Sequence, residues 1–152
     1  MSGSVATARV ASGNVAVAEV VIDGSPEEVW NVITSPEPRP EVMFGARTLT
    51  NWQVGGPIAW RGEWYGKPFE DHGEVLEFEP ERRLVVTHYS PMTGEPDVPD
   101  NYHTVSYTIS PAARGTKVIL EQDNNETPEA AEYSAKNWVK ALDGVRTVVE
   151  RD

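Results

Sequence analysis

The sequence contains no cysteine, and this single absence excludes several kinds of functional site. Without thiols the chain forms no disulfide bond, no zinc–cysteine site and no thiolate nucleophile. Proteins of reducing compartments generally lack disulfides, so the composition fits such a compartment. A cytoplasmic location is therefore expected.

Positive charge is scarce as well. The chain has 13 Lys and Arg residues against 24 Asp and Glu residues, which gives a net charge of −11 at pH 7. Nucleic-acid phosphates and an anionic membrane surface would both be repelled by this excess of negative charge. The sequence therefore predicts no nucleic-acid partner and no membrane partner.

Long apolar runs are also missing. No stretch approaches the roughly 20 apolar residues that a membrane-spanning helix requires, and the N-terminus lacks the basic patch and apolar core of a signal peptide. What is present, 152 residues of which 39% are hydrophobic, is typical of one globular domain. Residues 1–14 are small, polar and without period, so we expect a mobile tail there and a single domain over residues 15–152.

The stretch from Thr127 to Arg151 has the pattern of a long amphipathic helix. Thr127 can cap such a helix, and Pro128 suits its first position. Apolar residues recur at spacings of three and four, at Ala131, Ala135, Trp138, Leu142, Val145 and Val149. A helix with one apolar face requires an apolar surface to lie on, and we expect the preceding strands to supply it.

Those preceding residues read as strands joined by short turns. The first strand is expected over 15–22, and Ser25 with Glu28 forms a capping box for a short helix that the following prolines end. A second turn of helix and a loop past Met43 and Phe44 are expected next. Further strands are predicted over 51–54, 58–64, 69–79, 83–90, 102–110 and 116–123. This order predicts an α+β fold of the helix-grip type, a curved antiparallel sheet wrapped around the C-terminal helix.

Five short motifs, in order along the chain, resemble those of one family. They are Ser25–Trp30 (S-P-E-x-V-W), Asn51–Gly56 (W-x-V-G-G), Gly73–Leu84 (G-x-V-L-x-x-x-P-x-R-x-L), Gly115–Val118 (G-T-x-V) and Trp138–Val145 (W-x-x-x-L-D-x-L). The set is similar to bacterial proteins related to the activator of the ninety-kilodalton heat-shock protein ATPase, within the START-like (SRPBCC) superfamily. The resemblance implies a deep apolar cavity between the sheet and the long helix. It implies no single chemistry, because such folds host many.

One region departs from the family pattern. Many relatives carry paired tryptophans after the first helix, where this chain has the residues Glu41-Val42-Met43-Phe44. The resemblance therefore assigns no role to such a pair here.

The chain has three histidines, and all of them are candidates for a site. His72, His88 and His103 each share strand parity with residues expected inside, and a meander places all three at one end of the sheet. His88 and His103 are expected to be neighbours on adjacent strands, with His72 farther away. Three ligands on three strands give weak spacing evidence for a metal, so we expect no metal and no cofactor, and a hydrogen-bonded polar rim instead.

Four aromatic residues are expected to face the side of the sheet that the helix covers: Trp60, Trp64, Tyr107 and Trp138. They can line a cavity or simply fill the core, and the sequence leaves both open. The leading hypothesis is a protein that binds a small apolar or aromatic molecule between sheet and helix, with the three histidines supplying polar contacts. One alternative is a cyclase-like enzyme that uses His88 or His103 with a tyrosine for proton transfer. The other is an interaction module for a chaperone or another protein partner.

Overall fold

The structure is a computed structural model that describes residues 6–37 and 45–151. These residues form one curved antiparallel sheet of eight strands, in the order β1-β2-β8-β7-β6-β5-β4-β3. The strands are β1 (Thr7–Ala11), β2 (Val15–Ile22), β3 (Arg47–Thr50), β4 (Pro57–Trp64), β5 (Lys67–Glu79), β6 (Arg83–His88), β7 (His103–Ala112) and β8 (Gly115–Gln122). The helices are α1 (Pro26–Ile33) and α2 (Pro128–Arg151), and two short 3-10 turns, η2 (Pro91–Thr93) and η3 (Pro99–Asn101), lie between β6 and β7.

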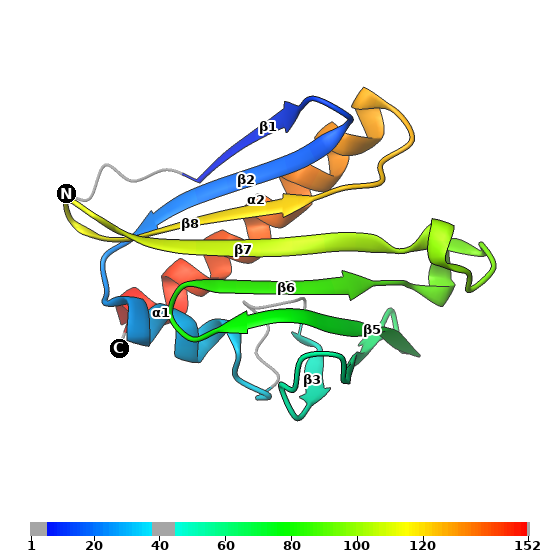
Figure 1. Ribbon diagram of the computed structural model, residues 1–152, viewed down its shortest axis with the longest axis horizontal. Coiled ribbons are helices and arrows are strands. Elements are labelled where there is room, and N and C mark those ends of the chain that lie inside the picture. Colours follow the sequence, from blue (N-terminus) through cyan, green and yellow to red (C-terminus); the bar gives the residue numbers. More distant parts are fainter. Residues whose placement is uncertain (1–5, 38–44, 152) are drawn as a thin grey trace.

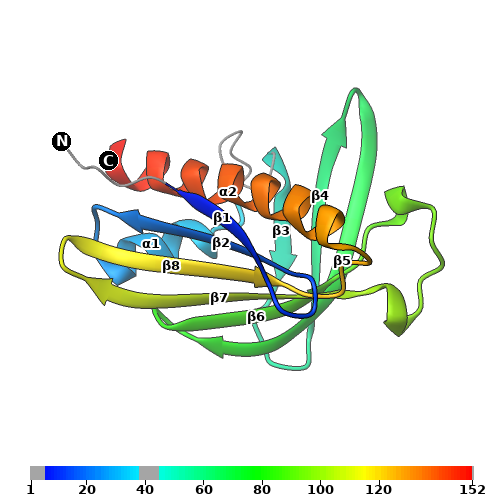
Figure 2. The same ribbon diagram turned by 90° about the horizontal axis from the view of Figure 1, so that it is seen from above.

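The long C-terminal helix α2 lies across one face of the sheet, as Figures 1 and 2 show. Its first turn is capped as expected, because the hydroxyl of Thr127 accepts a hydrogen bond from the amide of Ala130 at 3.0 Å. The predicted apolar face is turned inward: Leu142 and Val145 are buried in the core, and Trp138 is partly buried against it. The α+β helix-grip fold predicted from the sequence is therefore confirmed.

Helix α1 closes one end of the sheet (Figure 1). It begins with the predicted capping box, in which Ser25 Oγ accepts from the amide of Glu28 and the Glu28 carboxylate accepts from the amide of Ser25. Trp30 of this helix is buried and meets the ring of Phe78 at a centroid distance of 5.3 Å. The helix thus seals one end of the core, so any opening between α2 and the sheet must lie elsewhere.

The expectation of a mobile tail over residues 1–14 is wrong for Thr7–Ala11, which form β1. This strand pairs with β2 along its length, from Thr7 opposite Glu19 to Ala11 opposite Val15. Its side chains are mostly exposed, so the sequence shows no apolar period there. An edge strand needs only backbone hydrogen bonds to its neighbour, and a side-chain pattern does not report those.

The expected strand over residues 51–54 is also wrong. The strand lies earlier, at Arg47–Thr50, and the chain then turns, with Trp52 in the left-handed region at φ 57°. The Asn51 side chain accepts a hydrogen bond from the amide of Gln53 at 3.1 Å, a local bond that favours a turn over a strand. The second turn of helix and the loop past Met43 and Phe44 fall on residues 38–44, which lie outside the described residues.

The turn between β7 and β8 docks tightly on the connection between β2 and α1. Gly115 there has φ +100°, and a Cβ at this position would stand 2.1 Å from the carbonyl oxygen of Ile22. Next to it, Thr116 donates its hydroxyl hydrogen to the carbonyl of Gly24 at 2.8 Å. The close approach leaves room for glycine alone at position 115.

We expect Gly115→Ala to lower the free energy of unfolding by about 3 kcal/mol or more, because a left-handed backbone and a backbone clash act together. Gly13→Ala is the matched control. Gly13 also lies in a hairpin turn with φ +81°, but its Cβ would meet nothing within 4 Å. Its cost should stay near 1 kcal/mol. Urea unfolding of both variants measures the difference, and equal losses would contradict the docking of this turn.

Candidate functional site

A cleft opens between the first half of α2 and the end of the sheet farthest from α1. Its volume is about 490 Å³. The hairpin of β4 and β5 rises from the sheet on the same side as α2 (Figure 2). The described residues that line the cleft are Ala46, Trp60, Phe69, Asp71, His88, Ser90, Met92, Gln122, Tyr133, Ser134, Asn137 and Trp138. Its walls therefore come from four strands, from α2 and from the turn η2.

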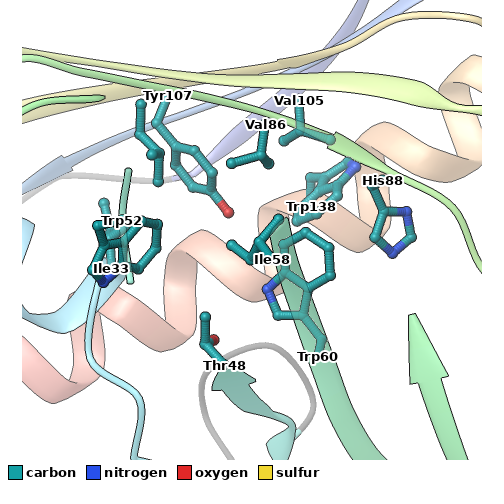
Figure 3. Close-up of a pocket in the computed structure, with 11 residues that line it drawn as sticks. Ile33, Thr48, Trp52, Ile58, Trp60, Val86, His88, Val105, Tyr107 and Trp138 are labelled. Atoms are coloured by element: carbon teal, nitrogen blue, oxygen red, sulfur yellow. The ribbon is translucent and has the colours of Figure 1, made fainter. Parts of the chain in front are cut away.

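A second, inner pocket continues from the cleft toward α1. Its lining, drawn in Figure 3, is Ile33, Thr48, Trp52, Ile58, Trp60, Leu84, Val86, His88, Val105, Tyr107 and Trp138. The two spaces share Trp60, His88 and Trp138, which Figure 3 shows grouped on one side of the inner pocket. The inner volume is only about 30 Å³, roughly the space of one water molecule. Among the described residues, side chains thus nearly fill the deep region between sheet and helix, and the outer cleft is much the larger of these two spaces.

Four of the residues selected from the sequence line the inner pocket together: Trp60, His88, Tyr107 and Trp138. Strand alternation explains this grouping, because Leu84, Val86 and His88 all point to one face of β6. The Tyr107 hydroxyl points into the pocket in Figure 3. Burial raises the pKa of Tyr107 far above its ordinary value, so this side chain is a neutral phenol at physiological pH.

Asp71 and His88 form a hydrogen-bonded pair in the wall of the cleft. His88 Nε2 lies 2.9 Å from Asp71 Oδ2, and the two side chains are 19% and 16% exposed. An ionised carboxylate only accepts hydrogen bonds, so the imidazole donates its Nε2 hydrogen to Asp71. The ring of His88 also lies 5.1 Å from that of Trp60, at a tilt of 59°. The pair therefore presents a fixed polar group between aromatic walls.

Three polar atoms at the cleft are buried without a hydrogen-bond partner among the described residues. They are Asp71 Oδ1, His88 Nδ1 and Gln122 Oε1, and each belongs to a residue that lines the cleft. Leaving a buried polar atom unpaired typically costs about 1–3 kcal/mol, so such atoms are uncommon. All three belong to residues of the cleft wall, but the atoms themselves are buried and do not face open space.

Sequence reasoning missed Asp71, because it considered this residue only beside His72. Asp71 lies opposite Trp60 in the register of β4 and β5, so the two side chains share a face. The sequence did contain a signal for this position. Asp71 lies two residues after Phe69 on the same strand, so both side chains point to the same face. A bulge between Val75 and Glu77, where the register shifts by one residue, concealed it.

The same bulge places His72 on the opposite face of the sheet from the cleft, contrary to expectation. The expectation placed His72 inside because it shares strand parity with Leu76. Leu76, however, is 38% exposed, and its neighbour Val75 is the buried residue. The His72 ring lies instead against the loop between β6 and β7, with Nε2 2.9 Å from Asp97 Oδ2 and 3.0 Å from the Tyr102 hydroxyl. His72 is therefore no neighbour of His88 in the cleft.

His88 and His103 are opposite each other in the register of β6 and β7, which confirms the predicted adjacency. His103 nevertheless lines neither the cleft nor the inner pocket. Its Nδ1 donates a hydrogen bond to the carbonyl oxygen of Asp123 at 2.8 Å, which ties the ring to the end of β8. Trp64 is the last residue of β4, and its side chain lies outside the description.

The described part of the chain places no group of three or more His, Asp or Glu side chains where they could hold a metal ion. Neither described helix is long and apolar enough to cross a membrane. The candidate site is accordingly an aromatic cleft with a polar wall, built from protein side chains.

The fold defines the broad class. A curved antiparallel sheet that grips a long C-terminal helix is the architecture of START-like (SRPBCC) proteins. Within that class, residues 23–150 match the family model described as Activator of Hsp90 ATPase homolog 1-like protein. The chain therefore belongs to this family.

Solved structures agree with the assignment. A protein of Cytophaga hutchinsonii is 40% identical, with a TM-score of 0.77 over 90% of this chain and 94% of that one. A Rhodobacter sphaeroides protein is 20% identical, with a TM-score of 0.75 over 97% and 99% of the two chains. CalU16 from Micromonospora echinospora is 22% identical, with a TM-score of 0.67 over 96% and 84%. The last two show the shared fold alone. Among curated proteins no match is found.

The outer-face cluster, His72 with Asp97 and Tyr102, holds the loop between β6 and β7 to the sheet. The hydrogen bond from Tyr102 to Asp97 raises the pKa of the tyrosine to about 12. The same bond, with a smaller contribution from His72, lowers the pKa of Asp97. Because η2 of this loop carries Met92 at the cleft, the cluster fixes one part of the cleft wall from the far face.

We expect Tyr102→Phe to be less stable than the wild type at pH 8, with a difference that shrinks between pH 10 and pH 12. A tyrosine whose pKa is raised by folding stabilises the folded state below its ordinary pKa of about 10 and loses that contribution as the pH rises through the folded value. Urea unfolding between pH 8 and pH 11.5 measures this. Tyr133→Phe, at a position 70% exposed, is the control and should change stability little at any pH. A difference for Tyr102→Phe that does not vary with pH would contradict the assignment.

Proposed function

We propose that this protein binds a small, flat, mostly apolar molecule in the cleft between α2 and the sheet. The observation that carries the proposal is the combination of volume and lining. A space of about 490 Å³ falls within the range of roughly 300–1,000 Å³ that is usual for small-molecule sites. Its walls include Trp60, Phe69 and Trp138, with a few polar groups at fixed positions.

The aromatic residues would supply most of the affinity. Trp60 is only 7% exposed, so its ring is held rigidly by the surrounding core. Trp138, on the opposing helix, also lines the cleft. A flat ligand in contact with both rings would bury apolar surface on two sides, at little cost in side-chain entropy. The net charge of −11 favours ligands without negative charge.

The exposed apolar residues support a ligand site over a broad docking surface for a protein partner. The large apolar residues that are exposed in the described part of the chain are Val10, Val54, Tyr65, Leu76, Met92, Val98 and Tyr133. They come from strands, turns and a helix, and two of them, Met92 and Tyr133, line the cleft itself. Interaction surfaces usually gather such residues into one continuous patch.

A second candidate function is proton transfer on a bound ligand, as in a cyclase-like enzyme. The Asp71–His88 pair favours it, because a carboxylate that accepts from one ring nitrogen orients the imidazole beside the cleft. Tyr107 would act as a neutral donor in the adjoining pocket. Loss of His88 from an enzyme would abolish turnover and leave part of the ligand affinity, whereas a binding protein leaves its ligand unchanged.

Trp138→Ala should weaken the binding of Nile red, a flat neutral dye, by about ten-fold or more, because one wall of the cleft is removed. It should also cost roughly 3–5 kcal/mol of stability as a core truncation. Trp52→Ala is the matched control: Trp52 is also partly buried and lines the inner pocket, but it does not line the cleft. Dye titration and urea unfolding on the same samples separate the two effects. Equal loss of affinity in both variants would place the dye elsewhere.

His88→Gln tests the polar wall. We expect it to weaken dye binding about three-fold or more, since the ring contacts Trp60 and is oriented by Asp71. His103→Gln changes the opposite residue of the neighbouring strand, which does not line the cleft, and should leave the affinity unchanged. Fluorescence titration of the three proteins provides the measurement. A larger effect from His103→Gln than from His88→Gln would refute this placement of the site.

A further inference from the structure

The loop between β6 and β7 contributes to the cleft wall without being part of the core. It projects from the end of the sheet farthest from α1 (Figures 1 and 2). Residues 91–100 are all exposed, and neither η2 nor η3 contains a buried residue. A segment without buried apolar contacts opens at a small cost in free energy. This loop nevertheless supplies Met92 to the cleft lining, so this part of the wall can move without disturbing the core.

Polar contacts on the outer face of the sheet restrain the loop. Tyr102 donates its hydroxyl hydrogen to Asp97 Oδ1 at 2.5 Å, and His72 Nε2 lies 2.9 Å from Asp97 Oδ2. Tyr89, just before the loop, donates to the carbonyl oxygen of Glu95 at 2.5 Å and stacks its ring on that of Tyr102. Polar contacts near the surface are individually weak, because water competes for the same groups. The restraint can therefore be released and formed again.

The short turn η2 can move as a unit. Gly94, which ends it, has φ +81°, and a Cβ at this position would meet nothing within 4 Å. At the other end, Ser90 Oγ accepts from the amide of Met92 at 3.3 Å, a bond that lies within the turn itself. Closing loops usually pivot on a few residues at the ends of an element. Ser90 and Gly94 stand at such positions.

Two exposed apolar side chains line the cleft from different elements. Met92 of η2 is 59% exposed and Tyr133 of α2 is 70% exposed. Exposed apolar surface is stabilised when another apolar group covers it. A ligand in the cleft would provide that cover, and a movement of η2 toward it would bury Met92. Methionine suits this task, since its unbranched side chain adapts to surfaces of different shape.

We propose that residues 91–101 form a gate of the cleft, which Met92 closes over a bound ligand and which Asp97 and Tyr102 restrain from the outer face. The gate rests on the proposed function, that a small molecule binds in the cleft, and adds how that molecule enters and leaves. Release of Asp97 from Tyr102 lets η2 move away from the cleft and admits the ligand. Contact between Met92 and the ligand then holds the loop closed.

Stopped-flow fluorescence with Nile red tests the gate, because it gives the association and dissociation rate constants separately. Met92→Ala should raise the dissociation rate constant about three-fold or more, since the contact that holds the loop over the dye is lost. Val98→Ala is the matched control. Val98 is an apolar residue of the same loop, 42% exposed, and it does not line the cleft. Its substitution should leave both rate constants unchanged.

Asp97→Ala and Tyr102→Phe test the restraint on the outer face. Each should raise both the association and the dissociation rate constant of Nile red about three-fold or more, because a restrained loop slows entry and exit alike. Neither side chain lines the cleft, so the ratio of the two rate constants should change less than either constant alone. Tyr102→Phe retains the ring that stacks on Tyr89, which preserves the packing at the base of the loop.

Amide hydrogen exchange of residues 92–94 provides a second readout that does not depend on the dye's fluorescence. It should be faster in Asp97→Ala and Tyr102→Phe than in the wild type. In the wild type it should become slower when Nile red is bound. Circular dichroism and urea unfolding establish that each variant is folded.

The outcomes separate the gate from the function on which it rests. Binding of Nile red in the cleft with rate constants that Met92→Ala does not change, or that both outer-face variants leave unchanged, overturns the gate and leaves a ligand-binding cleft. An effect of Val98→Ala as large as that of Met92→Ala also overturns it. Absence of Nile red binding by the wild type contradicts the proposed function itself, and the gate with it.

Discussion

The cleft depends on where the C-terminal helix lies on the sheet. Helix α2 packs mainly on β1 and β2, with further contacts to β8 and α1. The strands of the other half, β4 to β6, curve around toward the helix and contribute the opposite wall of the cleft (Figure 2). Small residues of α2, Ala131 and Ala135, are fully buried in the first half of the helix, which lets its backbone approach the sheet closely there. On the side toward β4, large side chains such as Trp60 and Trp138 line the space between sheet and helix. Where these large side chains fill the space between sheet and helix, the core is nearly closed. Beyond them it opens into the cleft.

This arrangement explains why the deep cavity implied by the family resemblance is reduced to a small inner pocket. Aromatic and branched side chains from both walls, including Tyr107 and Trp138, converge on a space of about 30 Å³. Protein interiors are close-packed, and large rings at facing positions leave little residual volume. The usable space is displaced toward the open end, where polar residues such as Asp71 and Gln122 replace apolar ones.

The sequence predicts the parts of the structure that are encoded by side-chain periodicity. The helix stripe that ends at Val149 and the capping box of Ser25 and Glu28 depend on local spacing, and both were predicted correctly. The inward orientation of Trp60, His88 and Tyr107 follows from alternation along regular strands. Two errors arose where backbone hydrogen bonding or a turn decides the structure: the edge strand at Thr7–Ala11 and the end of β3. The third error came from the bulge in β5. One inserted residue moves every side chain beyond the bulge to the opposite face of the sheet from the one that simple alternation predicts. That reversal both removed His72 from the cleft and concealed Asp71.

The polar wall of the cleft is difficult to explain by stability alone. A hydrogen-bonded carboxylate and imidazole, partly withdrawn from water, commonly add no more stability than well-packed apolar residues of similar size would. Two atoms of the Asp71–His88 pair and the oxygen of Gln122 are buried without partners among the described residues, which lowers stability further. The residues that carry these atoms belong to the described wall of the cleft, whereas on the outer face Asp97 and Tyr102 are hydrogen-bonded to each other. Local costs of this kind are typical of functional sites, which agrees with the site proposed in the cleft.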